Sequence, residues 1–313
     1  MNYGKRAAGE NGRNSALRPV TVLLLALVAF FWALCFPLIN LGLSSAPPLK
    51  FAGLRALIAG CTVLVLAFVL RRPLPRGWRI WAELLIVGGG ATTLGFFGMF
   101  IGGARVTPGL ATVIENTQPL IAAVLAWLLL GESLGSHRRA GLLLGFAGIA
   151  VISAPRFADG TPNSATGLEI LLASAFGVGL ANVVLKSLTG RVDVLMAVGW
   201  QLLLGSGPLL IAGACVEQRQ TVHWDPVFAF ALLTLSLLGT AVASVLWFYL
   251  LRRAAVGRLT TYTFLTPVFG LLLSYLLFGE RLNVWQISGT VLVLAGVWRM
   301  TRSTNSNRES PGT

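Results

Sequence analysis

Two ionisable residues lie inside long apolar stretches of the chain, where a charge is costly. Glu115 falls in the run Glu115-Asn116-Thr117-Gln118-Pro119, and Arg55 falls about five residues into another apolar stretch. A charge at the centre of a membrane helix costs roughly 3 kcal/mol on insertion scales, so such residues mark functional sites by default. We therefore expect Glu115, Arg55, Asn116 and Gln118 to contribute to a polar binding or coupling site.

These two charges permit more than one chemistry. Glu115 can bind a substrate ammonium group or a coupling proton, and Arg55 can pair with Glu115 or hold a substrate carboxylate. The structural alternative is a buried ion pair that only fixes helix packing. Normal transport by Glu115→Gln at every pH would favour that alternative.

Aromatic residues and prolines complete the set of candidates. The residues predicted to line an apolar part of a cavity are Trp32, Phe96, Met99, Trp247 and Tyr249. Packing in the core or against lipid is the alternative for each of them. Thr263 lies among hydroxyl residues shortly before Pro267. A proline inside a helix removes a backbone donor and frees a carbonyl, so Pro119 and Pro267 are candidate hinges or cavity walls.

The elements that must position these residues are membrane helices. Of 313 residues, 55% are hydrophobic and 11% are charged. Soluble proteins carry about a quarter charged residues, so a water-soluble globule is excluded. With about 20 apolar residues needed for each span, the sequence predicts ten spans. They are residues 20–41, 51–70, 80–101, 109–130, 140–155, 167–187, 194–216, 227–250, 259–279 and 283–300.

The basic residues predict how these spans are oriented. Of the 24 Lys and Arg residues, 18 fall on one side of the predicted spans or at that end of them, five fall on the other side, and Arg55 alone lies well inside a span. Because cytoplasmic segments carry the excess of basic residues, we expect both termini in the cytoplasm and the protein in the inner membrane. The net charge of +13 then reflects topology, and no nucleic-acid partner is expected.

The chain contains an internal repeat at an offset of 148 residues. The segment 112–148 aligns without gaps to 260–296, which matches Pro119 with Pro267 and Gly148 with Gly296. Five predicted spans separate the copies, and this odd number makes equivalent helices cross in opposite directions. Inverted repeats of this kind can open a central site to either side of a membrane. The sequence therefore predicts an all-α polytopic membrane protein, with two inverted five-helix repeats around a central cavity.

Several short motifs follow one another along the two copies of the repeat. They are Phe31-Trp32-Ala33 through Pro37, Pro47-Pro48-Leu49-Lys50-Phe51 leading to Arg55, and two Pro…Gly-Glu-x-Leu segments, one in each copy. Together they resemble the drug/metabolite transporter superfamily, in the form with two EamA-type domains. The second copy departs from the pattern, because Phe176 and Gln201 stand roughly where Trp32 and Arg55 would recur. The resemblance implies ten helices, a central cavity, and export or uptake of small metabolites.

The predicted organisation has five parts. They are a cytoplasmic tail at 1–19, a first EamA-type repeat at 20–155, an external loop at 156–166, a second repeat at 167–300, and a cytoplasmic tail at 301–313. The tails are polar and are expected to be disordered.

These features favour a secondary transporter, an exporter of small organic metabolites such as amino acids, working by alternating access. No P-loop is present, His137 and His223 fall in loops on opposite faces, and the three cysteines have no paired spacing. We therefore expect no enzyme activity, catalytic residues, metal or cofactor. The expected partners are a small-molecule substrate, the lipid bilayer and protons. The alternatives are a broad multidrug efflux carrier and a membrane scaffold or sensor without flux.

Overall fold

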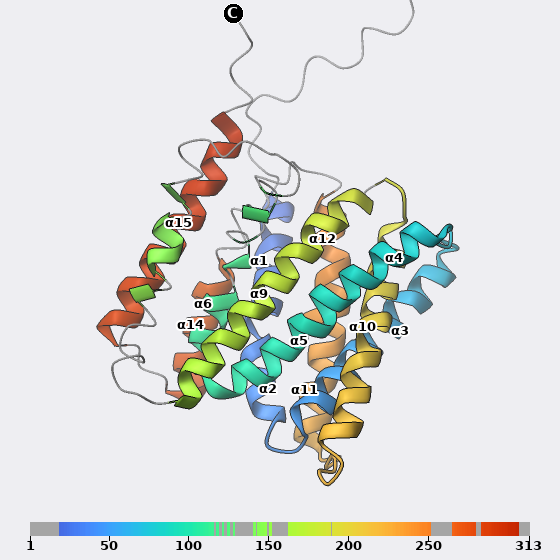
Figure 1. Ribbon diagram of the computed structural model, residues 1–313, viewed down its shortest axis with the longest axis horizontal. Coiled ribbons are helices and arrows are strands. Elements are labelled where there is room, and N and C mark those ends of the chain that lie inside the picture. The colour runs from blue at the N-terminus through green and yellow to red at the C-terminus, as the bar shows by residue number, and fades with distance from the viewer. Residues whose placement is uncertain are drawn as a thin grey trace, which may run out of the picture.

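The structure of the protein is a computed structural model in which helices joined by loops make up the described residues (Figure 1). It describes residues 19–115, 117, 118, 121, 124, 125, 128, 140, 141, 143–148, 150, 151, 162–188, 190–251, 265–279 and 283–306. The helices lie side by side in a bundle (Figure 1). The prediction of an all-helical membrane protein is confirmed to this extent.

The helical elements divide between the two repeats. The first repeat contains α1 (Pro19–Ala33), α2 (Cys35–Gly42), α3 (Pro48–Val69), α4 (Trp78–Val87), η1 (Gly88–Leu94), α5 (Gly95–Phe97), η2 (Gly98–Gly102), η3 (Gly103–Arg105) and α6 (Pro108–Glu115). The second contains α9 (Pro162–Leu188), α10 (Val194–Val216), α11 (Pro226–Ser236), η4 (Leu237–Val242), α12 (Ala243–Leu251), α14 (Leu265–Phe278) and α15 (Val284–Ser306). The segments η1, η2 and η4 are π-helical, and η3 is a 3-10 helix.

Within the part of the chain that the structure describes, six helical stretches are long and apolar enough to cross a membrane. They are Leu23–Gly42, Pro48–Val69, Trp78–Arg105, Ala165–Leu185, Val194–Val216 and Pro226–Trp247. Two shorter apolar helices, Phe269–Phe278 and Ile287–Gly296, lie within the last two predicted spans. The predicted spans at 109–130 and 140–155 fall partly outside the described residues. The count of ten spans therefore stays a prediction.

Several helix boundaries differ from the sequence prediction. For example, α9 begins at Pro162, inside the predicted external loop at 156–166. The predicted span at 20–41 is interrupted at Leu34, between α1 and α2. Pro37 explains this interruption, since it has no N–H to donate to the carbonyl of Ala33 and its ring crowds that carbonyl. At the other end of the chain, α15 continues to Ser306. Residues 301–306 are thus helical where a disordered tail was expected, because an established helix propagates more easily than a new one nucleates.

The offset of 148 residues also relates parts of the structure outside the aligned segment. The π-helix η1 maps onto residues 236–242, and the π-helix η4 spans Leu237–Val242. Thr92 and Thr240 fall at equivalent positions and are both buried. Single-turn π segments are rare and often lie at functional sites. Their recurrence extends the repeat to the third helix of each half.

Equivalent helices of the two copies run in opposite directions where they touch. A Cβ on Gly148 would lie 2.6 Å from the carbonyl oxygen of Gly289, and a Cβ on Gly296 would lie 2.6 Å from that of Gly141. The offset of 148 exchanges these two contacts with each other, as a two-fold axis requires. Residue numbers rise along one helix as they fall along the other, so the two helices are antiparallel. The two helices therefore make the contact expected between equivalent helices of an inverted repeat.

The helices α3 and α10 form a second such pair (Figure 1). A Cβ on Gly60 would lie 2.9 Å from the backbone nitrogen of Leu203, and one on Gly199 would lie 2.7 Å from the side chain of Leu64. Glycine lets the two backbones approach closely, as is common between membrane helices. Residue numbers again rise along one helix as they fall along the other, so α3 and α10 are antiparallel.

One end of this pair is closed by a reciprocal cap between α3 and α10. The Glu217 carboxylate accepts hydrogen bonds from the N–H groups of Leu49 (2.8 Å) and Lys50 (3.0 Å) at the start of α3. In return, Lys50 Nζ donates to the carbonyl oxygens of Glu217 (2.9 Å) and Gln220 (2.6 Å) after α10. Pro48 has no N–H, so Glu217 satisfies the donors of the first turn of α3 that have no partner within the helix.

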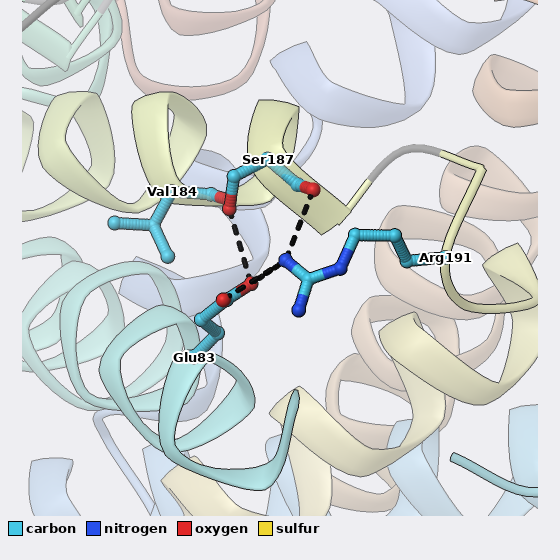
Figure 2. Close-up of polar contacts among 4 residues, drawn as sticks. All are labelled: Glu83, Val184, Ser187 and Arg191. Atoms are coloured by element: carbon cyan, nitrogen blue, oxygen red, sulfur yellow. Dashed lines mark hydrogen bonds and ion pairs between the residues drawn. The ribbon is translucent and has the colours of Figure 1, made fainter. Parts of the chain in front are cut away.

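The opposite end of the bundle is joined by more exposed charges. Arg72 Nη1 lies 3.8 Å from Asp193 Oδ2, where Asp193 also accepts a hydrogen bond from the first turn of α10. Nearby in sequence, Arg191 Nη1 donates to both carboxylate oxygens of Glu83 at 2.9 Å (Figure 2). The hydroxyl of Ser187 also donates to Glu83 (3.1 Å), which connects α4 to the end of α9.

The loop that follows α10 carries a second helix cap. Asp225 precedes α11, and its carboxylate accepts a hydrogen bond from the N–H of Phe228 at 2.9 Å. The Ser45 hydroxyl and this N–H both lower the pKa of Asp225, because each hydrogen bond favours the charged carboxylate. The backbone N–H of His223 donates to the Ser45 carbonyl oxygen (2.8 Å). The loop between α2 and α3 therefore contacts the loop between α10 and α11.

Candidate functional site

Arg55 lies in the interior of the bundle, on the second turn of α3 and next to a cluster of aromatic rings. The residue is 2% exposed. The ring of Phe51 packs edge-on against those of Phe100 (4.9 Å between centroids) and Phe228 (5.0 Å). A buried guanidinium beside such a cluster is expensive unless its donors are satisfied.

Neutral groups from both repeats hold Arg55 in place. Its Nε donates to the hydroxyl of Thr240 (3.1 Å) in η4, and its Nη2 donates to the sulfur of Cys35 (3.3 Å) in α2. The Phe96 ring covers one face of the guanidinium, with 4.4 Å between Cζ and the ring centroid. This distance is that of a cation–π interaction. Arg55 thereby joins three helices of the first repeat to the π segment of the second.

The third nitrogen of this guanidinium has no partner. Arg55 Nη1 is buried and makes no hydrogen bond. Among the described residues, ion pairs join Arg72 to Asp193 and Arg191 to Glu83, and none joins Arg55 to Glu115. The hypothesis that Arg55 serves as the ion-pair partner of Glu115 is therefore not met in this structure.

Glu115 lies at the last residue of α6 and is 6% exposed. Its Oε1 accepts a hydrogen bond from the hydroxyl of Ser174 (2.9 Å) in α9. Its Oε2 is buried without a hydrogen-bond partner. Gln118, one turn further along the chain, is partly buried. The side chains of Ser174 and Gln118 are thus the neutral polar neighbours of this carboxyl group.

The hydrogen bonds of Ser174 depend on the protonation state of Glu115. The Ser174 hydroxyl lies 2.9 Å from Glu115 Oε1 and 3.0 Å from the carbonyl oxygen of Gly95. A hydroxyl carries one proton and can fully satisfy only one of two acceptors. If Glu115 is protonated on Oε1, this group donates to Ser174 and Ser174 donates to the carbonyl oxygen of Gly95, so both contacts are satisfied. Gly95 adjoins Phe96, which covers Arg55, so α5 lies between the two ionisable residues.

The predicted aromatic residues do not form one group in the structure. Phe96 is buried in the cluster around Phe51, and Met99 packs against the same cluster. Trp32 and Trp247 pack against each other, with 5.4 Å between ring centroids, in a separate cluster between α1 and α12. Pro267 lies within α14. The remaining candidates lie outside the described residues or have side chains outside the description: Asn116, Pro119, Tyr249 and Thr263.

Three polar residues of the site were not selected from the sequence. They are Cys35, Thr240 and Ser174, the direct partners of Arg55 and Glu115. Thr240 could have been found by extending the repeat, because it matches Thr92 at the offset of 148. Cys35 and Ser174 carry no comparable signal in the sequence.

These features define a polytopic membrane protein built from a duplicated helical unit, with ionisable groups buried inside it. The profile of the EamA-like transporter family matches residues 19–154 and again 165–302. The chain belongs to the EamA-like transporter family.

Individual relatives agree with this assignment. The chain is 34% identical over 280 residues to the uncharacterized transporter YvbV of Bacillus subtilis, covering 88% of this chain and 90% of that one. It is 28% identical over 285 residues to the probable amino-acid metabolite efflux pump of Escherichia coli, covering 88% of this chain and 92% of the pump. One crystal structure at 20% identity covers 94% of this chain and all of its own, with a TM-score of 0.63, which shows that the fold is shared.

Proposed function

We propose that the protein is a secondary transporter that exports small organic metabolites such as amino acids across the inner membrane by alternating access. Relatives named as amino-acid metabolite efflux pumps support the substrate class, at 28% identity. The antiparallel contacts between equivalent helices support the mechanism, because two pseudo-symmetric halves can exchange conformations. In this proposal both termini lie in the cytoplasm and ten helices surround the central path.

The observation that carries the proposal is the buried carboxyl group of Glu115. It lies among neutral residues, with one oxygen bonded to Ser174 and the other without a partner. In a membrane interior such a group is costly and is retained where ions or substrates pass. We assign to Glu115 the binding of a coupling proton, which completes the hydrogen-bond chain through Ser174 to Gly95. Release of that proton leaves one of these contacts unsatisfied and so favours a different conformation.

The test is uptake of labelled amino acids into proteoliposomes, with and without an imposed pH gradient. Wild-type protein is expected to show saturable flux that responds to the gradient. Glu115→Gln keeps a hydrogen-bonding side chain of similar size and is expected to retain flux but lose this response. Glu169→Gln is the matched control, since Glu169 is an exposed glutamate on α9.

Three outcomes would contradict the proposal at different points. An unchanged gradient response in Glu115→Gln would remove Glu115 from the coupling. No flux of any amino acid by folded protein would remove the substrate class. Flux of hydrophobic cations in place of amino acids would favour a multidrug carrier.

A further inference from the structure

The charge of Arg55 is not balanced by the residues around it. Its contacts are a threonine hydroxyl, a thiol and an aromatic ring, all of them neutral. Buried charges in proteins are generally paired with an opposite charge. Within the described residues, no acidic side chain lies within ion-pair distance of Arg55. A bound anion would provide the missing partner.

The geometry of the guanidinium limits where such an anion can bind. Nε is engaged by Thr240, and one proton of Nη2 is directed at Cys35. The Phe96 ring covers a face of the group, so that face is closed to a ligand. What remains is the edge formed by Nη1 and the second proton of Nη2. An edge with two parallel N–H groups is the surface of arginine that matches a carboxylate.

We propose that this edge of Arg55 binds the carboxylate group of the transported molecule. The inference rests on the proposed transport function and narrows its substrate to carboxylates. A monoanionic carboxylate neutralises the single charge of Arg55, whereas a phosphate dianion would leave a net negative charge buried in a low-dielectric interior. The rings of Phe96 and Phe100 lie 4.4 Å and 5.9 Å from Arg55 Cζ, and these apolar surroundings favour a carboxylate with an apolar or aromatic body.

Nearby hydroxyl groups offer further polar contacts. Ser236 lies one turn before Thr240 on the same helical stretch, and its Oγ is buried without a hydrogen-bond partner. Both residues belong to the second repeat, whereas Arg55 belongs to the first. The guanidinium and its hydroxyl partner would therefore separate if the two repeats moved apart. A ligand at this edge would depend on how the repeats are arranged, as alternating access requires.

Cys35 provides a direct measurement of this site. Its sulfur is 3.3 Å from Arg55 Nη2, and Cys61 and Cys215 are exposed. In a Cys61→Ser/Cys215→Ser background, Cys35 is the single thiol, and its reaction with methyl methanethiosulfonate reports on occupancy of the edge. The probes are phenylacetate and L-phenylalanine, with phenethylamine, L-phenylalaninamide and inorganic phosphate as matched controls.

Phenylacetate and L-phenylalanine are expected to slow the modification of Cys35. The slowing should be about tenfold at about ten times Kd, as mass action requires. The two probes that lack a carboxylate, and phosphate, should not protect. Arg55→Gln should abolish the protection, and Arg55→Lys, which keeps the charge, should retain part of it. Arg105→Gln, a change at an exposed arginine, should leave it intact.

Three results would overturn the inference. They are equal protection by phenethylamine or phosphate, protection that survives in Arg55→Gln, and no protection by either carboxylate. If Cys35 does not react without ligand, equilibrium binding of labelled phenylacetate to wild-type and Arg55→Gln protein decides instead, and equal binding refutes the inference. Amino-acid flux without carboxylate binding at Arg55 would refute this inference alone. Binding without flux would refute the transport function and leave the carboxylate site.

Discussion

The reciprocal cap between α3 and α10 predicts that Glu217 is a major determinant of stability. Glu217 is 6% exposed, and its carboxylate accepts two backbone N–H groups of α3. These donors belong to the first turn of α3 and have no partner within the helix. Because Pro47, the residue before α3, makes no side-chain cap, the carboxylate of Glu217 performs that role from the other repeat.

The expected cost of losing this cap follows from the contacts. A hydrogen bond to a charged group contributes roughly 1.5–3 kcal/mol, and a carboxylate at a helix N-terminus adds roughly 0.3–1 kcal/mol. Glu217→Ala removes two such bonds together with the charge at the helix N-terminus, so the free energy of unfolding should fall by about 3–7 kcal/mol. Glu217→Gln keeps one amide oxygen as an acceptor and should lose about half of that.

Thermal unfolding in detergent micelles, followed by size-exclusion chromatography, measures this loss. Glu217→Ala should lower Tm by on the order of 10 °C, with Glu217→Gln between it and wild type. Glu169→Gln removes a charge from an exposed site and should change Tm little. If Glu217→Ala unfolds within about 2 °C of the Glu169→Gln control, Glu217 does not stabilise the start of α3 as a cap.

Three further predictions concern packing, pH and a surface ion pair. A Cβ on Gly90 would lie 2.6 Å from a backbone oxygen of α9, whereas a Cβ on Gly89 would meet nothing within 4 Å. Gly90→Ala should therefore reduce the yield of folded protein, and the control Gly89→Ala should not. Equal yields of the two variants would refute the close contact. Because the pKa of Asp225 is lowered from 3.8 in the folded protein, its stabilising effect is present above that value and is lost as the pH falls through the lower folded pKa. The Tm difference between wild type and Asp225→Asn should therefore shrink from pH 7 towards pH 3, and a constant difference would contradict this. The side chain of Arg191 is 43% exposed, so Arg191→Gln should lower the free energy of unfolding by less than about 1 kcal/mol in thermal unfolding. A loss of stability as large as that of Glu217→Ala would contradict the expectation that this exposed ion pair contributes little.

The sequence was sufficient to predict a helical membrane protein, because a bilayer imposes both the length and the apolar composition of the helices that cross it. The interruption at Leu34 was not predicted, although Pro37 carries the signal for it. The π segments were harder to foresee, since the sequences 88–94 and 237–242 differ from ordinary apolar helix only by their glycines and threonines. Their equivalence emerges once the offset of 148 is applied to the structure.

The ionisable residues of the site could be selected from the sequence, but their partners could not. Arg55 and Glu115 stand out because charges are rare within apolar stretches. Thr240 is 185 residues from Arg55, and Ser174 is 59 residues from Glu115. Contacts over such distances depend on how the helices pack, and the hydrophobic pattern does not specify that packing. For the same reason, the sequence did not predict the helix cap formed by Glu217, which lies 168 residues from Leu49.

Counterflow tests most directly whether this protein is a carrier with alternating access. Proteoliposomes loaded with an unlabelled amino acid are diluted into a trace of the same amino acid carrying a label. A carrier exchanges one for the other, so the label should accumulate transiently above its equilibrium level and then decline. A channel or a scaffold produces no such overshoot. Its absence for every amino acid tested, with protein shown to be folded, would contradict alternating-access transport of amino acids.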